Sequence, residues 1–206
     1  MLLNPNLTIT AMAGIAIALV IGVTFHEFSH AFTADQLGDH RPRALGRVSL
    51  NPARHIDPFG ALLFLIAGFG YGRPVPVNVY ALRPGRIGMA IVAAAGPIAN
   101  VVVALVFAVL YRAIQISGLR MDFVEQVVLS AVFYNFVLAI LNLIPIPPLD
   151  GYNVVLPFLP PRYAFTVQRY AQYGFFVLLL LVFIPGSPLG QLLGLAEPLT
   201  RLVIGA

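Results

Sequence analysis

The sequence predicts an all-α polytopic membrane protein, a single domain over residues 1–206, with about five to six transmembrane segments and a short membrane-associated β-hairpin or strand region. Hydrophobic residues make up 59% of the chain and charged residues only 10%. About a quarter of the residues in a typical soluble domain are charged. So few charges could not cover the surface of a soluble protein of 206 residues. Several apolar runs also approach the roughly 17–25 residues that a helix needs to cross the hydrocarbon core.

Five apolar segments are candidates for membrane-spanning helices. Long helices are expected over about residues 7–37, 87–111, 123–143 and 163–184. A shorter segment, 58–70, is flanked by Pro and Gly and could be a tilted span or a re-entrant segment. Arg169 weakens the prediction for the first turns of the last span. The tail after Pro185 is amphipathic at best, and Pro198 interrupts it.

The strand prediction concerns residues 73–80, which read R-P-V-P-V-N-V-Y. Their alternation places Val75, Val77 and Val79 on one face, as in a strand. Two prolines restrict such a strand to a sheet edge because each lacks an N–H group. A polyproline-like connector fits equally well. If a strand forms, its open edge could accept an unwound peptide by β-augmentation.

The basic residues predict how the chain is oriented in the membrane. All twelve are Arg, and seven of them lie between residues 41 and 86, in a stretch between apolar segments. The positive-inside rule places this stretch in the cytoplasm. We therefore expect an integral protein of the cell (inner) membrane, with its first helix running inward. No nucleic-acid-binding motif accompanies the net charge of +4. The N-terminus has no basic region before its apolar run, which indicates a retained helix rather than a cleaved signal peptide.

The strongest chemical signal is the segment His26-Glu27-Phe28-Ser29-His30, an H-E-x-x-H pattern within the first apolar helix. On a helix, His26 and His30 project from one face one turn apart, so both can bind one Zn²⁺ ion. Glu27 lies beside them and can take a proton from the attacking water. The alternatives are a chance match or histidines packed as core donors. Three ionisable groups in five residues of a membrane helix are costly, and they favour a functional site.

A catalytic zinc usually has three protein ligands, so the motif is one ligand short. The chain has no cysteine, which leaves His, Asp and Glu as candidates. Asp150 differs from the other acidic residues because it follows three prolines that must break the fourth span. Broken helix at membrane depth is tolerated where it lines a cavity. An ordinary Asp-Gly turn is the alternative explanation for Asp150.

Two motifs together resemble the site-2 protease family of intramembrane metalloproteases. One is the segment 25–30, F-H-E-F-S-H, and the other is the segment 142–151, N-L-I-P-I-P-P-L-D-G, which matches the family pattern N-x-x-P-x-x-x-L-D-G. The segments 96–100, G-P-I-A-N, and 55–58, H-I-D-P, are similar too. The resemblance covers most of the chain. No segment is long or polar enough for the PDZ or cystathionine-synthase-type domain that many members carry, so the chain resembles a compact member.

The resemblance implies a site and an activity. His26, His30 and Asp150 would bind one Zn²⁺ per chain, and Glu27 would be the catalytic base. Asn142 would help to hold the substrate or the developing oxyanion. The implied activity is hydrolysis of peptide bonds in or near transmembrane segments, in regulated proteolysis. The implied partners are transmembrane protein substrates that another protease has already cut, within the lipid bilayer and without nucleic acid.

Asn100 and its neighbours in the third span need a separate interpretation. Small residues and proline in membrane helices commonly serve close packing and kinks, and this is the expectation for Gly96 and Pro97. An uncompensated amide is costly in lipid. Asn100 could therefore help to orient the active-site region.

Three rival functions remain open from the residues. A prenyl-protein protease type would not need Asp150 in a broken fourth span. A membrane metal-ion carrier could use the same three ligands as a transient site. It would need Glu27 only as a charge, so Asp could replace it, whereas a hydrolase needs the reach of Glu. A catalytically silent relative that binds membrane segments would not need Glu27 at all.

Overall fold

The computed structural model describes residues 8–57, 60, 72–83, 85–118, 121–184 and 186–205, which are mostly helical. The elements follow in the order α1 (Ile9–Gln36), α2 (Arg41–Ala44), η1 (Pro52–Arg54), α4 (Arg86–Ser117), α5 (Asp122–Asn142), α6 (Asp150–Val155), η2 (Leu156–Phe158), α7 (Pro161–Tyr170), η3 (Ala171–Tyr173), α8 (Gly174–Phe183), α9 (Pro188–Gly194) and α10 (Ala196–Ile204).

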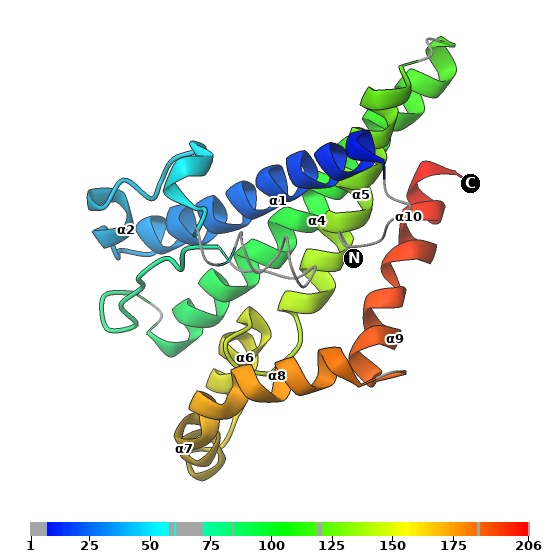
Figure 1. The fold of residues 1–206 in the computed structure, drawn as a ribbon. Coiled ribbons are helices and arrows are strands. Elements are labelled where there is room, and N and C mark those ends of the chain that lie inside the picture. The colour runs from blue at the N-terminus through cyan, green and yellow to red at the C-terminus, as the bar shows by residue number, and fades with distance from the viewer. Residues whose placement is uncertain are drawn as a thin grey trace.

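Three of the predicted spans are confirmed as helices of membrane-crossing length. They are α1, α4 and α5, with 28, 32 and 21 residues. All three pack against one another, and they form the centre of the molecule (Figure 1). The shorter predicted segment, 58–70, lies outside the described residues apart from residue 60.

Small residues bring the three long helices close together. Ala11, Gly14, Ala18 and Gly22 recur every three or four positions along one buried face of α1. A Cβ atom on Gly14 would lie 3.6 Å from Val127 of α5, at ordinary van der Waals distance. Lipid tails are as apolar as the side chains, so close packing and buried hydrogen bonds hold membrane helices together.

The predicted fifth span, residues 163–184, is not one helix in the structure. The turn η3 separates α7 from α8, and α8 has only ten residues. That is about 15 Å of helix, half the thickness of the hydrocarbon core. Gly174, the first residue of α8, packs so closely on Pro147 that a Cβ atom at this position would clash with the backbone of Pro147. In the described part of the chain, three helices rather than five to six are therefore candidate spans.

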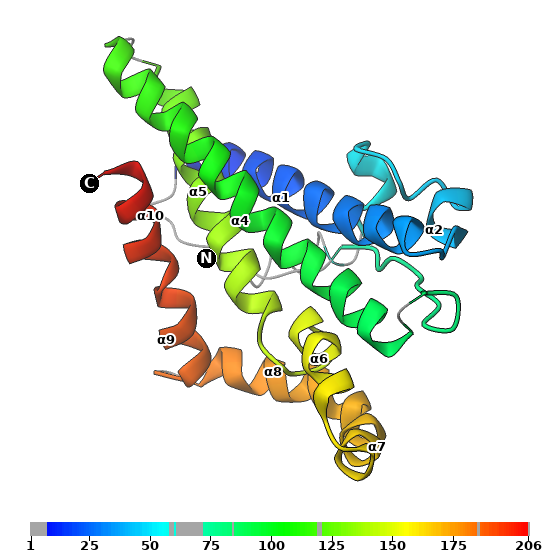
Figure 2. The ribbon, with the colours of Figure 1, turned by 180° about the vertical axis from the view of Figure 1, so that it is seen from behind.

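The C-terminal elements form an arm beside the three-helix centre. In Figure 2 α8 lies across the molecule and α9 and α10 return along α5. The arm is anchored by an apolar cluster at α4, α5 and α10, whose buried members are Ala104, Ala108, Val132, Phe136 and Ala196. This cluster is the dry part of the core.

The predicted β-hairpin or strand is not confirmed in the described residues. Ile56 and Gly72 form one isolated antiparallel bridge, and residues 73–78 have no ladder partner. Side chains, rather than a neighbouring strand, form hydrogen bonds with the backbone groups of this segment. Arg47 donates to the carbonyls of Arg73 and Pro74, and an Asp39 oxygen accepts from the N–H of Asn78. The connector interpretation therefore fits the structure.

Candidate metal centre

Three predicted ligands converge between α1, α4 and the start of α6. His26 Nε2 and His30 Nε2 lie 3.0 Å apart. Asp150 Oδ2 lies 3.0 Å from the first nitrogen and 3.2 Å from the second. Both histidines are buried and Asp150 is half-buried. The fold therefore brings together residues that are more than a hundred positions apart in the sequence.

The tautomer of each imidazole follows from its outer hydrogen bond. His30 Nδ1 lies 2.7 Å from the carbonyl oxygen of Val92, which can only accept, so Nδ1 must carry the proton. His26 Nδ1 lies 2.7 Å from Asn100 Oδ1 and donates to it. In neutral histidine the other nitrogen then has a free lone pair. Both Nε2 lone pairs are thus available to a metal ion.

Asn100 is fixed in the orientation that this assignment requires. Its Nδ2 donates to the carbonyl of Gly22 at 3.1 Å and to Asn135 Oδ1 at 2.9 Å. Asn135 in turn donates to the carbonyl of Ala131 at 2.8 Å. Both amides are fully buried. Asn100 thus contacts His26 directly, and its role in orienting the active-site region stays a prediction that this contact supports.

Gly96 makes room for the two imidazoles. A Cβ atom at this position would lie 2.5 Å from His30 Nε2 and 2.6 Å from His26 Cε1. Any side chain here would push the rings away or separate α4 from α1. Gly96 serves close packing, as expected, but its neighbours are the ligand rings themselves.

The proline-rich break places Asp150 at the site. The helix α5 ends at Asn142, and Asp150 begins α6, which packs against α4. A Cβ atom on Gly151 would clash with the backbone of Leu143 and Ile144. Only glycine therefore allows α6 to lie this close to the end of α5, which explains why Asp and Gly occur as a pair.

The three atoms fit a zinc ion chemically. Among the residues that the structure describes, Asp150 Oδ2 is buried without a hydrogen-bond partner. Two lone pairs and a carboxylate oxygen facing one another repel unless a cation lies among them. Tetrahedral zinc with bonds of about 2.0–2.1 Å spaces its ligand atoms about 3.3 Å apart. The observed separations of 3.0–3.2 Å are close to that spacing.

Glu27 lies on a different face of α1, toward the loop that precedes α4. Glu27 is buried, and its Oε2 lies 3.9 Å from Arg47 Nη2. Arg47 is also buried, and its guanidinium donates to the carbonyls of Arg73 and Pro74. A Cβ atom on Gly72 would lie 3.0 Å from Glu27 Oε1. Gly72 therefore lies against the carboxylate, and Arg47 connects the carboxylate with the backbone of residues 73 and 74.

Asn142 and three acidic residues lie away from the three converging atoms. The Asn142 side chain donates to the carbonyl of Leu138 on its own helix at 3.0 Å. Asp35 and Asp39 pair with Arg43 and Arg41 beyond the site. An Asp57 carboxylate oxygen accepts from the N–H of Gly60. The role of Asn142 stays a prediction.

Sequence reasoning missed Asn135 and Arg47. An amide in the middle of an apolar helix is a signal for Asn135, of the kind that identified Asn100. Arg47 gives no such signal, because it is one of seven arginines in a polar stretch. Only the fold distinguishes this buried arginine from its exposed neighbours.

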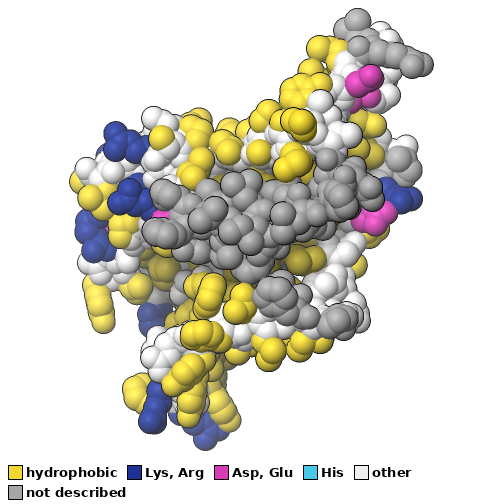
Figure 3. Space-filling model, viewed as in Figure 1, with side chains coloured by type: hydrophobic (Ala, Val, Ile, Leu, Met, Phe, Trp, Pro, Cys, Tyr) yellow, Lys and Arg dark blue, Asp and Glu magenta, His cyan; other side chains and the backbone are white. Residues whose placement is uncertain are grey.

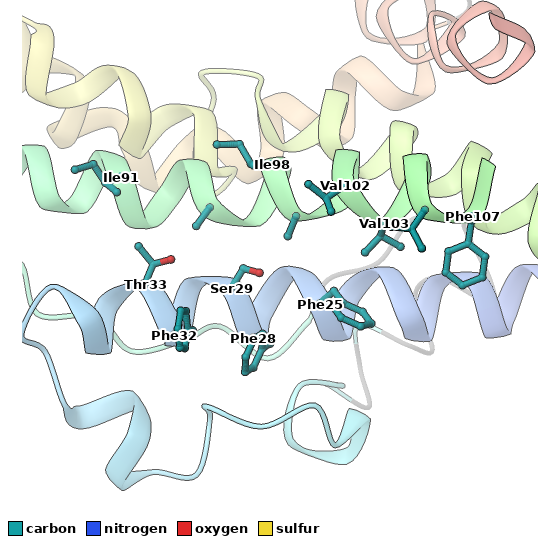
Figure 4. Close-up of a pocket in the computed structure, with 13 residues that line it drawn as sticks. Phe25, Phe28, Ser29, Phe32, Thr33, Ile91, Ile98, Val102, Val103 and Phe107 are labelled. Atoms are coloured by element: carbon teal, nitrogen blue, oxygen red, sulfur yellow. The ribbon is translucent and has the colours of Figure 1, made fainter. Parts of the chain in front are cut away.

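An apolar groove of about 570 Å³ runs beside the site between α1 and α4 (Figure 4). Phe25, Phe28 and Phe32 line it from α1, and Ile91 and Ile98 line it from α4. The hydroxyls of Ser29 and Thr33 are its polar groups. The groove borders the H-E-x-x-H segment and has the apolar character of a lipid-facing surface.

These features define a membrane metalloprotease: a bundle of membrane-length helices, an H-E-x-x-H segment on one of them, and a carboxylate that could complete a three-ligand metal site. Comparisons with known proteins then give the family. A model described as Peptidase family M50 matches residues 113–184. The chain belongs to this family, the site-2 proteases.

The relatives carry matching names. "Putative zinc metalloprotease YwhC" of Bacillus subtilis is 36% identical over 182 residues, which cover 86% of this chain and 83% of that protein. "Putative zinc metalloprotease Rip2" of Mycolicibacterium smegmatis is 31% identical over 186 residues, 84% of this chain and 69% of that protein. "Putative zinc metalloprotease MJ0611" of Methanocaldococcus jannaschii is 30% identical over 156 residues, 73% of each chain. No solved structure matches the chain significantly.

Proposed function

We propose that this protein is an intramembrane zinc endopeptidase that hydrolyses peptide bonds in or near transmembrane segments of other membrane proteins. One observation carries the proposal. The two Nε2 lone pairs and Asp150 Oδ2 converge between two helices of membrane length, α1 and α4, and the start of α6, with Glu27 next to His26 in the sequence. A soluble metallopeptidase does not need to bury its ligands inside a membrane bundle.

The residues divide the chemistry among them. His26, His30 and Asp150 would hold one zinc ion, which when bound polarises a scissile carbonyl and lowers the pKa of a water molecule. Glu27 takes the proton from the attacking water and passes it to the leaving amine. Asn100 keeps the His26 lone pair directed at the site. Asn142, at the end of α5, helps to hold the substrate or its oxyanion.

The substrate must expose its backbone before it is cut. A transmembrane helix keeps its carbonyls in hydrogen bonds to residues four positions away, so it has to unwind locally. Gly, Pro or polar residues near the cut lower this cost. Residues 73–78 follow Gly72, which lies against Glu27, and form no ladder in the described chain, so their backbone could bind the unwound substrate. Substrates already cut by another protease fit this site, because a shortened segment enters a bundle more easily.

The arginines support an orientation in the inner membrane. Arg41, Arg43, Arg47 and Arg54 follow the end of α1 that carries the metal site, and Arg86 begins α4. The positive-inside rule favours the cytoplasm for this end. The active site then lies nearer the cytoplasmic side, where water reaches it.

A reconstituted cleavage assay tests the proposal. The purified chain is placed in liposomes with a panel of single-span substrates, some helical throughout and others with Gly or Pro in the span. Mass spectrometry of the products locates the cut. We expect zinc-dependent cuts within or beside the spans, absent with Glu27→Gln. Cleavage that occurs only in soluble peptides would contradict the proposal.

A further inference from the structure

The helix α7 carries a basic face that the metal site does not use. Its residues Arg162, Phe165, Thr166 and Arg169 occupy positions i, i+3, i+4 and i+7, so they form one row over two turns. All four are exposed, whereas Ala164, on the opposite side, is buried. The row therefore points away from the body of the protein.

Aromatic side chains border this row. Phe165 is 70% exposed, and Tyr163 and Tyr170 on the adjoining face are 51% and 58% exposed. The Arg162 guanidinium lies over the Tyr163 ring, 4.6 Å from its centroid. So much aromatic surface is costly in bulk water, but Tyr and Phe are favourable at the interface between headgroups and acyl chains.

Within the described part of the chain, no acidic residue forms an ion pair with Arg162 or Arg169. The sequence has no Asp or Glu between Asp150 and Glu197. Among the described residues, neither Arg162 nor Arg169 forms an ion pair, whereas Arg201 of α10 pairs with Glu197. The charge of α7 is therefore available to an external anion.

The position of α7 matches a membrane surface. In both ribbon views α7 lies at the same end of the three-helix centre as α2 and the start of α4 (Figures 1 and 2). Basic side chains gather near α2 and again near α7 (Figure 3). The helix is followed by the apolar α8, which is too short to cross the bilayer.

We propose that α7 lies flat on the bilayer and binds the phosphate groups of anionic phospholipids through Arg162 and Arg169. The guanidinium fork matches phosphate oxygens, and the aliphatic stems can lie along the interface while the charges reach the headgroups. Phe165, Tyr163 and Tyr170 enter the boundary between headgroups and acyl chains. This surface fixes the depth of the C-terminal arm. The proposal does not depend on the peptidase activity.

The chain is well suited to a depth measurement because it has no cysteine. A single cysteine at Gln168, exposed on α7, carries a fluorophore in the full chain in nanodiscs. Lipids with a nitroxide in the headgroup, or deep in the acyl chain, quench it by proximity. Nanodiscs of phosphatidylcholine alone are compared with nanodiscs containing phosphatidylglycerol. We expect the headgroup nitroxide to quench the fluorophore more strongly than the acyl-chain nitroxide does. Quenching by the headgroup nitroxide should increase when phosphatidylglycerol is present, and high salt should abolish this increase.

Variants separate lipid binding from damage to the fold. The double variant Arg162→Gln/Arg169→Gln should lose the phosphatidylglycerol-dependent rise, and Arg162→Lys/Arg169→Lys should keep most of it. The matched control Arg112→Gln/Arg201→Gln removes two exposed charges at the other end of α4 and on α10, and should change nothing. Unchanged zinc content in the Gln variant shows that the core is intact.

Four results would overturn the proposal. Equal quenching in the two kinds of nanodisc would exclude recognition of anionic headgroups. Stronger quenching by the deep nitroxide would place α7 within the hydrocarbon. Quenching only by a water-soluble agent would place it in solution. The fluorophore could also stay protected from the water-soluble quencher when anionic lipid is absent. Together with crosslinking between chains, that result would show that a second copy of the chain covers this face of α7.

Discussion

The two sides of α1 around the H-E-x-x-H segment are held in different ways. On one side, the outer nitrogens of His26 and His30 bond to Asn100 and to the Val92 carbonyl at 2.7 Å. On the other side, Gly72 lies against Glu27, and in the described part of the chain the ion pair of Glu27 is with Arg47, at 3.9 Å. A tight shell suits ligands that must keep one geometry. A looser one suits a carboxylate that must take a proton and return it. Substitutions on the two sides should therefore separate metal binding from turnover.

The largest expected effect on turnover is that of Glu27→Gln. The amide keeps the shape of the side chain but cannot accept a proton, so we expect cleavage to fall by about 10²–10⁴-fold. Zinc content should stay at the wild-type level. Mass spectrometry of substrate cleavage and elemental analysis of the same sample check both points. A Gln variant with normal cleavage would show that Glu27 is not the base.

Gly96→Ala should have the next largest effect, on zinc binding rather than on turnover. Its methyl group would lie within 2.6 Å of both imidazoles, so we expect zinc affinity to fall by more than about 100-fold. Gly14→Ala is the matched control in another membrane helix, because its methyl group meets Val127 at an ordinary 3.6 Å. Zinc titration of both variants checks this. Equal zinc affinity in the two would mean that the rings do not need the space.

Asn100→Ala should lower zinc affinity without abolishing zinc binding. Without Asn100 Oδ1, the His26 ring loses the bond that fixes its tautomer, and removing such a partner typically lowers metal affinity by about 10–100-fold. Asn135→Ala, one step farther from the metal, should have a smaller effect of the same sign. The comparison is a competition against a zinc chelator. A larger loss of zinc affinity in the Asn135 variant than in the Asn100 variant would contradict the order of the hydrogen bonds from His26 through Asn100 to Asn135.

Arg47→Gln should lower turnover while leaving zinc bound. Loss of the guanidinium releases residues 73 and 74 from Glu27, and a small misplacement of reacting groups can cost roughly 10–100-fold in rate. Arg47→Lys keeps the charge but not the fork, so an intermediate rate is expected. Arg54→Gln, exposed in the same loop, is the control. If the Gln variant loses zinc as well, Arg47 stabilises the whole fold and does not act only on the position of Glu27.

The smallest effect concerns Asp39, which anchors Asn78 beyond the end of α1. Hydrogen bonds from Arg41 hold the pKa of Asp39 below its ordinary value of 3.8, although burial raises it. A lowered pKa stabilises the fold above pH 4 or so, and this stabilisation disappears as the pH falls through the folded-state pKa. Asp39→Asn should lower the melting temperature at pH 7 by roughly 2–4 °C. The difference from wild type should shrink at lower pH, and a constant difference would contradict this origin.

The sequence predicted the parts of the site that depend on local pattern. His26, Glu27 and His30 form a helical motif, and the prolines before Asp150 made the break in the chain predictable. Asn135 and Arg47 could not be assigned, because their roles depend on contacts between distant segments. The interruption of the predicted fifth span at η3 was also missed, since the apolar composition of the run does not indicate it. The strand prediction rested on alternation alone, and here side chains satisfy the backbone that a neighbouring strand would pair.

The most direct test of the central claim is the zinc content of the purified protein. Wild type, Glu27→Gln and Asp150→Ala are compared in detergent after equilibration with zinc and removal of the excess. The account predicts about one zinc ion per chain in wild type and in Glu27→Gln, and little in Asp150→Ala. An Asp150→Ala variant that keeps its zinc, or a wild type that binds none, would contradict a metal centre formed by His26, His30 and Asp150.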